Sequence, residues 1–269
     1  MAAYITLLRP LNGLMSVIAV WIGALIAGAP FVPDISIIFG MVAVFLISGG
    51  GMAINDFFDV EIDKLNKPNR PLASGKISKR AALAYSGALF IIGNAAAYMI
   101  SFDAFITAVV VSALLIAYAA YLKKTILIGN LIVSGLVGLT FVFGGIIIGD
   151  YLPVLPLALL AFLSNTAREI YKTVDDAMGD RRYNVNSLAI KIGVVRTRII
   201  GNVFLIVAVI FSFVPYFLGL LGIMYMFFVL LADIIFLSAV IAPAKYSSKL
   251  IKVAMIIALI AFIAGAVKI

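Results

Sequence analysis

The chain has 269 residues, of which 65% are hydrophobic and only 12% are charged, and its mean hydropathy is +1.22. Water-soluble globular proteins are far less apolar, so the composition predicts an integral membrane protein. The absence of cysteine and histidine excludes disulfides, thiolate chemistry and an imidazole base or metal ligand. The net charge of +8 does not indicate a nucleic-acid partner, because the cations follow a membrane pattern.

Apolar runs long enough to cross about 30 Å of hydrocarbon as helices recur along the whole chain. We therefore expect an all-α membrane protein, a bundle of nine transmembrane helices that forms one polytopic domain over residues 1–269. The first run follows Arg9-Pro10 and lacks a cleavage site followed by a polar domain, so it is predicted to be a span and not a signal peptide. The nine spans are predicted near 11–28, 36–54, 80–100, 104–122, 126–148, 152–170, 198–217, 222–241 and 250–267.

The positive charges lie on one side of these predicted spans. If the amino terminus is cytoplasmic, 19 of the 20 Lys and Arg residues are cytoplasmic and only Lys268 is not. The positive-inside rule therefore predicts a multi-pass cell-membrane protein with a cytoplasmic amino terminus and cytoplasmic active-site loops. The two longest polar connections, near 57–78 and 173–197, lie four spans apart, and each begins with an acidic cluster. This predicts two weakly repeated four-helix units and one added helix; two unrelated loops are the alternative.

The first acidic cluster follows an apolar run directly, where a loop charge is least expected. Asn55, Asp59 and Asp63 are spaced by four residues, so on a helix each step turns only about 40° beyond a full turn and all three share one face. Asp176 and Asp180 repeat this spacing in the second cluster. Solvated charges that balance nearby cations are the alternative interpretation.

Oxygen ligands about 6 Å apart along a helix are too spread for one all-protein metal cage. They suit Mg²⁺, which prefers oxygen, keeps waters and commonly binds through one or two carboxylates together with phosphates. We therefore expect Mg²⁺ as cofactor and a diphosphate held between the two acidic rows. The predicted metal ligands are Asn55, Asp56, Asp59, Asp63, Asp176 and Asp180.

Three cations near these rows are predicted to bind phosphate. Arg70 lies in the turn-forming stretch Asn69-Arg70-Pro71-Leu72, which could aim its guanidinium. Lys123 closes the fourth span, and Lys172 lies four residues before Asp176. The alternative for each is anchoring or snorkelling at the membrane surface, which we prefer for Lys76, Lys79 and Lys124.

These motifs resemble the signatures of the UbiA superfamily of intramembrane prenyltransferases. The first is Asn55-Asp56-x-x-Asp59-x-Glu61-x-Asp63 with Asn66-x-Pro68-x-Arg70-Pro71-x-x-Ser74-Gly75-x-Ile77-Ser78. The second is Arg168-Glu169-Ile170-x-Lys172 with Asp176-x-x-Gly179-Asp180, and supporting matches are Arg9-Pro10-x-Asn12, Tyr118-x-x-Tyr121-x-Lys123 and Gly129-Asn130. The chain departs from this pattern at Thr173 and Asp175, where relatives often have Asp and Glu.

The resemblance implies a nine-helix bundle with a membrane-open cavity and Mg²⁺-dependent transfer of an isoprenyl group from a diphosphate to an acceptor. An incipient allylic cation would suit the aromatic faces of Tyr118 or Tyr121. Without histidine, the acceptor proton must pass to a carboxylate, water or the released diphosphate. The expected catalytic residues are Asp59, Asp63, Arg70, Lys123, Asp176 and Asp180. The expected substrate-binding residues are Arg9, Asn12, Arg70, Tyr118, Tyr121, Lys123, Asn130, Lys172 and Arg181.

The acceptor is predicted from the variant Glu61-Ile62-Asp63-Lys64-x-Asn66-x-Pro68. It most resembles archaeal enzymes that add a second geranylgeranyl group to the hydroxyl of geranylgeranylglyceryl phosphate, a lipid-phosphate acceptor. An aromatic or chlorin acceptor is the alternative within the superfamily. A secondary transporter is the alternative from another class, although transporter sites lie near the membrane midplane, where only Asp233 is found. For Asp233 we expect a hydrogen bond to a neighbouring helix.

Overall fold

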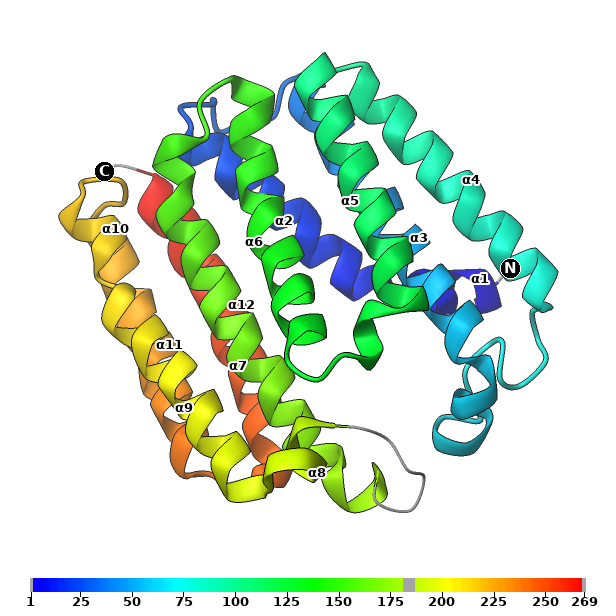
Figure 1. Cartoon of the computed structure of the whole chain (residues 1–269). Coiled ribbons are helices and arrows are strands. Elements are labelled where there is room, and N and C mark those ends of the chain that lie inside the picture. The colour runs from blue at the N-terminus through cyan, green and yellow to red at the C-terminus, as the bar shows by residue number, and fades with distance from the viewer. Residues whose placement is uncertain (1, 181–186, 268–269) are drawn as a thin grey trace. The chain divides into compact units, whose positions relative to one another are not determined.

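Every element of the computed structural model within the described residues is helical, as Figure 1 shows. The structure describes residues 2–180 and 187–267, and within these ranges the side chains of all but Lys124, residues 176–180, Ala244 and Lys245. Seven described helices are long and apolar enough to cross a membrane, or up to eight if the bent pair α1 and α2 forms one span. The predicted all-α membrane fold is confirmed to this extent, and the count of nine stays a prediction.

The helices follow one another with short connections. The first half contains α1 (Ala2–Leu8), α2 (Pro10–Ile26), α3 (Ile35–Asn66), α4 (Lys79–Tyr98), α5 (Phe102–Ala120), the 3₁₀ turn η1 (Leu122–Lys124) and α6 (Ile128–Ile148). The second half contains η2 (Leu152–Val154), α7 (Leu155–Asp180), α8 (Leu188–Ile192), α9 (Val194–Phe211), α10 (Val214–Phe217), α11 (Ile223–Ile241) and α12 (Ala244–Ala266).

Side-chain caps explain where three of the spanning helices begin. Asp34 Oδ1 accepts a hydrogen bond from the N–H of Ile37 at the start of α3. The Ser78 hydroxyl accepts from the N–H of Ala81 at the start of α4. The Ser101 hydroxyl accepts from the N–H of Ala104 at the start of α5. Each cap satisfies a backbone donor that the first helical turn leaves without an intrahelical partner.

The chain divides into two compact units, and unit 1 consists of Met1–Lys123 and Phe143–Tyr151. Its centre is α3, which packs against α1, α2, α4 and α5. Small residues allow close packing: a Cβ on Gly144 would lie 2.1 Å from the carbonyl oxygen of Val20, so only glycine fits there. Close backbone approach at small residues is a general means of packing helices in membranes.

Unit 2 consists of Lys124–Val142 and Leu152–Ile269. In this unit α7 packs against α9 and α12, and α11 packs against α12. Tyr171, Leu205 and Ile251 are fully buried in its core. Arg198 of α9 donates to the carbonyl oxygens of Val240 and Ala242, at 2.9 Å each, and so caps the last turn of α11.

Helix α3 continues well past the span predicted near 36–54. It ends at Asn66, so the acidic stretch from Asn55 to Asp63 is helical and not part of a loop. No proline or glycine interrupts the stretch after Gly51, and Pro68 disfavours helical geometry at Lys67, the residue that caps the helix. Helix α7 likewise extends ten residues past the predicted span, to Asp180.

Candidate active site

Asn55, Asp59 and Asp63 lie on the continuous helix α3 at intervals of one turn, the spacing that puts them on one face. Asn55 Nδ2 donates to Asp59 Oδ2 over 2.9 Å, one helical turn away. Asp63 lies one further turn along and is 5% exposed. Glu61 of the same helix differs in its exposure, because it pairs with Lys64 and Lys79 on the surface.

Two arginines from distant parts of unit 1 converge on the acidic face of α3. Arg9 Nη2 lies 2.5 Å from Asp56 Oδ1, and Arg70 Nη1 lies 3.2 Å from the same oxygen. Arg70 Nη1 also lies 2.6 Å from Asp63 Oδ2. Two carboxylates and two guanidiniums thus form one network, and the charge-assisted contacts are short, as such contacts usually are.

The turn that carries Arg70 is anchored from within. Arg70 N–H donates to the carbonyl of Lys67, and its own carbonyl accepts from Ser74. The next residues bury Leu72 and Ile77, each 4% exposed, in a cluster with Leu7. The expectation of an ordered turn is confirmed, and this turn fixes the backbone from which the Arg70 guanidinium reaches α3.

Lys123 forms a second cationic contact with α3. It lies in the η1 turn after α5, and its Nζ is 2.6 Å from Asp59 Oδ1 and 3.4 Å from Asn55 Oδ1. Its side chain is 15% exposed and that of Asp59 is 24% exposed. The structure therefore brings the predicted phosphate-binding lysine together with two of the predicted metal ligands.

Arg9 adopts a backbone conformation that arginine seldom takes. Its φ is 50° and its ψ is 65°, and no other non-glycine residue in the described part of the chain has a positive φ. The left-handed conformation costs about 1–2 kcal/mol for a residue with a Cβ. Arg9 lies at the bend of 48° between α1 and α2, where Pro10 begins the second helix. The bend directs the side chain to Asp56.

The remaining predicted substrate residues of unit 1 lie on α2 and at the end of α5. Asn12 lies in the first turn of α2, where its N–H donates to the carbonyl of Arg9. Tyr118 is partly buried in α5, and Tyr121, which follows that helix, is 75% exposed.

In unit 2 the second signature forms its own ion-paired group on α7. Glu169 accepts from Arg168 Nη1 at 2.9 Å and from Lys172 Nζ at 2.7 Å. Asp175 accepts a hydrogen bond from Ser248 of α12. The side chains of Asp176 and Asp180 and the whole of Arg181 lie outside the described residues, so their predicted roles stay predictions.

Other residues of unit 2 complete the comparison with the sequence. The Asn130 carbonyl accepts from Ser134, whose hydroxyl in turn accepts from Asn165 Nδ2. The predicted partner of Asp233 is found: Ser212, just after α9, donates to Asp233 Oδ2 at 2.7 Å. Sequence reasoning missed Ser248 and the acceptor role of Glu169; the spacing of Glu169 and Lys172 by three residues was the available signal for the latter.

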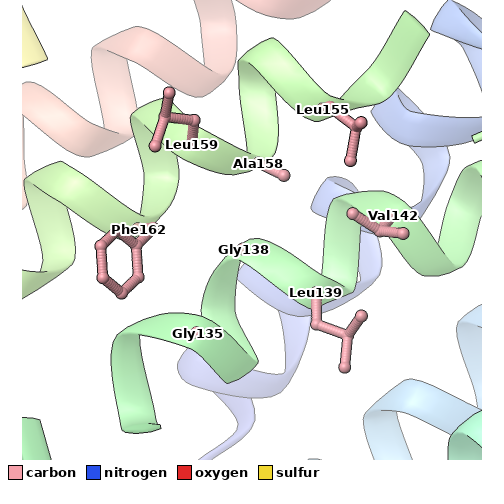
Figure 2. Close-up of a pocket in the computed structure, with 8 residues that line it drawn as sticks. All are labelled: Gly135, Gly138, Leu139, Val142, Leu155, Ala158, Leu159 and Phe162. Carbon is pink, nitrogen blue, oxygen red and sulfur yellow. The ribbon is translucent and has the colours of Figure 1, made fainter. Parts of the chain in front are cut away.

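An apolar groove lies between α6 and α7 of unit 2, as Figure 2 shows. Its volume is about 420 Å³. Gly135 carries no side chain into it, and a Cβ at this position would meet no atom within 4 Å. The lining residues are Gly135, Gly138, Leu139, Val142, Leu155, Ala158, Leu159 and Phe162.

The α3 cluster consists of Asn55, Asp56, Asp59 and Asp63, and its oxygen atoms suit a hard cation. Asn55 Oδ1 and Asp59 Oδ1 both lie near one cationic atom, Lys123 Nζ, so an amide and a carboxylate oxygen already converge. Amide and carboxylate oxygens are the donors that Mg²⁺ prefers. Within the described residues, no group of three or more acidic side chains is close enough to hold a metal ion by itself. A metal here would therefore need ligands from elsewhere, such as phosphate oxygens.

The helical membrane fold and the cluster on α3 define a multi-pass membrane protein with a mixed carboxylate and cation site. The profile of the UbiA prenyltransferase family matches residues 16–266, and the chain belongs to this family. Digeranylgeranylglyceryl phosphate synthase of Methanococcoides burtonii is 43% identical over 99% of this chain and 100% of its own length. The family membership makes the chain a prenyltransferase, as the motifs predict.

Solved structures agree with this assignment. One, from work described as "Structural and mechanistic insights into the biosynthesis of Digeranylgeranylglyceryl phosphate synthase in membranes", is 38% identical with a TM-score of 0.83 and covers 100% of this chain and 99% of its own. A UbiA homolog from Archaeoglobus fulgidus bound to GPP and Mg²⁺ has a TM-score of 0.73 over 98% of both chains. At 18% identity, the second comparison shows a shared fold alone.

Proposed function

We propose that the protein transfers a geranylgeranyl group from geranylgeranyl diphosphate to the free hydroxyl of geranylgeranylglyceryl phosphate. The product is digeranylgeranylglyceryl phosphate, which carries the second ether bond of an archaeal membrane lipid. The full-length similarity to a synthase of this name supports the choice of acceptor. The observation that carries the proposal is the convergence of Arg70 and Lys123 on the acidic face of α3, where cations and oxygen ligands stand side by side.

Asn55, Asp59 and Asp63 would hold Mg²⁺ from α3, and Asp176 and Asp180 would hold it from α7. The donor set fits, because the oxygens of Asn55 and Asp59 already converge on the Lys123 ammonium. The Archaeoglobus homolog that binds GPP and Mg²⁺ has the same fold, which supports the extension to this chain. When bound, Mg²⁺ would neutralise negative charge on the diphosphate.

Arg70, Lys123, Arg9 and Lys172 would bind the diphosphate oxygens. In the reaction the bond between the allylic carbon and the diphosphate oxygen breaks, and the acceptor oxygen forms a new bond to that carbon. Negative charge grows on the leaving diphosphate, so cations fixed in advance near its oxygens stabilise the transition state more than the ground state. The acceptor proton leaves to a carboxylate, water or the released diphosphate.

The lipid parts of the substrates need apolar surfaces. We place one isoprenoid chain in the groove of Figure 2, which is lined only by apolar residues and glycines. The aromatic faces of Tyr118 and Tyr121 would stabilise the allylic cation. Asn12 and Asn130 would contribute polar contacts to substrate, and Arg181 would meet the phosphate of the acceptor.

We also propose that the chain has nine spans: the seven long apolar helices, the pair α1 and α2 as one span, and α7. They form a single domain whose amino terminus is cytoplasmic. We place the amino terminus in the cytoplasm because this orientation puts 19 of the 20 Lys and Arg residues on that side. The continuous family match over residues 16–266 supports a single domain. Two repeated four-helix units remain part of this proposal.

One assay tests the reaction. The purified protein in detergent or liposomes is given Mg²⁺, labelled geranylgeranyl diphosphate and one of three acceptors: geranylgeranylglyceryl phosphate, 4-hydroxybenzoate or a chlorin. We expect product with the first acceptor alone, loss of product with EDTA, and loss of product after Asp59→Ala. Product with another acceptor only, or undiminished product with EDTA, would contradict the proposal.

A further inference from the structure

Asp56 differs from its acidic neighbours on α3 in its burial and in the cations that it contacts. Its exposed fraction is 2%, so it is the most buried of the three aspartates whose side chains pair with cations there. One oxygen, Oδ1, receives both Arg9 Nη2 at 2.5 Å and Arg70 Nη1 at 3.2 Å. By contrast, Asp59 is more exposed; it accepts a hydrogen bond from Asn55 Nδ2 and pairs with Lys123, the setting described above for a metal ligand.

Asp56 contacts both arginines but shares Arg70 with Asp63, which lies closer to that guanidinium. Arg9 extends from a left-handed backbone at the bend before α2, and its other terminal nitrogen, Nη1, donates to the sulfur of Met52, a weak acceptor. Asp56 is therefore the strong acceptor that fixes this guanidinium. Arg70 reaches Asp56 and Asp63 through a single nitrogen, Nη1. Its Nη2 and Nε remain the donors of this planar fork that can turn toward phosphate oxygens.

We propose that Asp56 is a positioning residue and not a metal ligand. It holds Arg9 and Arg70 as a pair at a fixed separation, ready for the oxygens of an isoprenyl diphosphate. Two guanidiniums placed side by side repel each other, and a shared buried carboxylate between them removes that cost before the substrate arrives. This role rests on the proposed function, because it concerns how the same site binds its diphosphate.

The variant Asp56→Asn separates the two roles. It keeps the size of the side chain and an acceptor oxygen but removes the negative charge that Arg9 and Arg70 share. For a positioning residue, we expect the KM for geranylgeranyl diphosphate to rise about 10-fold or more, while the Mg²⁺ concentration for half-maximal activity changes less than about twofold. Binding of Mn²⁺ to the purified protein, followed by electron paramagnetic resonance, should also match the wild type. Asp59→Asn is the matched control and should weaken Mn²⁺ binding.

A double-mutant cycle tests whether Asp56 acts through Arg9. Arg9→Gln alone should raise the same KM, and adding Asp56→Asn should raise it by clearly less than the product of the two single effects. Arg9→Gln leaves Asp56 paired with Arg70, so it also carries the test if Asp56→Asn fails to fold. Thermal unfolding of each purified variant identifies that failure.

Three results would overturn the inference: weakened Mn²⁺ binding in Asp56→Asn, an unchanged KM in Arg9→Gln, or fully multiplicative effects in the cycle. Failure of the proposed function has a different signature. In that case the wild-type protein makes no product from geranylgeranyl diphosphate and geranylgeranylglyceryl phosphate with Mg²⁺ present.

Discussion

Lys123 Nζ lies 2.6 Å from Asp59 Oδ1, although 64 residues separate the two in sequence. The contact joins the turn after α5 to the acidic end of α3. The Lys123 side chain is 15% exposed, and its ammonium also lies 3.4 Å from Asn55 Oδ1, so two residues of α3 define its position. A cation predicted to bind phosphate and a carboxylate predicted to bind metal are thus direct neighbours.

Replacement of this lysine should reduce turnover. We expect Lys123→Met to lower kcat about 100-fold, the effect typical of removing one preorganised group that stabilises developing negative charge. Steady-state kinetics with geranylgeranyl diphosphate measure it. Lys79→Met is the matched control, because Lys79 pairs with exposed Glu61 on the surface. Equal losses in both variants would show that general surface charge, and not the position of Lys123, is responsible.

Filling the groove between α6 and α7 should alter donor use. A Cβ at Gly135 would meet no atom within 4 Å, so we expect Gly135→Phe to place its ring in the groove that this residue lines. We expect this variant to use geranylgeranyl diphosphate at least about 10-fold less efficiently while it retains activity with a shorter isoprenyl diphosphate. Competition between the two donors gives the ratio. Gly87→Phe is the control: it lies on α4, where a Cβ would also meet no atom within 4 Å, and it should leave the ratio unchanged.

Gly144 should be irreplaceable for stability. A Cβ there would lie 2.1 Å from the Val20 carbonyl oxygen, which belongs to the backbone and cannot rotate away. We expect Gly144→Ala to destabilise the protein by about 1–3 kcal/mol, the usual range for overpacking. Thermal unfolding in detergent measures the shift. Gly87→Ala should be neutral or stabilising, since alanine favours helix and the site is open.

Asp233 should contribute to stability and not to catalysis. Its contact with Ser212 is a hydrogen bond between the residue after α9 and the middle of α11. Such bonds in membrane proteins average about 0.6 kcal/mol. We therefore expect Ser212→Ala to lower stability by about this amount, with prenyl transfer within twofold of wild type. A large loss of activity in a folded Ser212→Ala variant would assign the pair a role in the reaction.

The orientation in the membrane can be measured directly, because the chain contains no cysteine. Lys76 and Asp150 are both exposed and lie in connections predicted to be on opposite sides. In intact cells, a membrane-impermeant maleimide should label Asp150→Cys and spare Lys76→Cys. In inverted vesicles the pattern should reverse. The opposite result would place the acidic face of α3 outside the cell.

The sequence by itself determined the class of protein and one half of the site. Apolar length requires membrane helices, since only they satisfy their own backbone groups in lipid. The spacing of Asn55, Asp59 and Asp63 predicted a common helical face, which the continuation of α3 to Asn66 confirms. Both properties depend on local geometry alone, so periodicity and composition suffice to predict them.

Tertiary structure decided which partner each carboxylate meets. The motif treats Asp56 and Asp59 alike, yet one lies between two arginines and the other meets Lys123. These differences come from the bend at Arg9, the anchored turn at Arg70 and the end of α5. Contacts between residues far apart in sequence depend on how helices pack, and no spacing within one helix records them. The sequence therefore predicted the acidic face, and the fold decided which cation each of its carboxylates contacts.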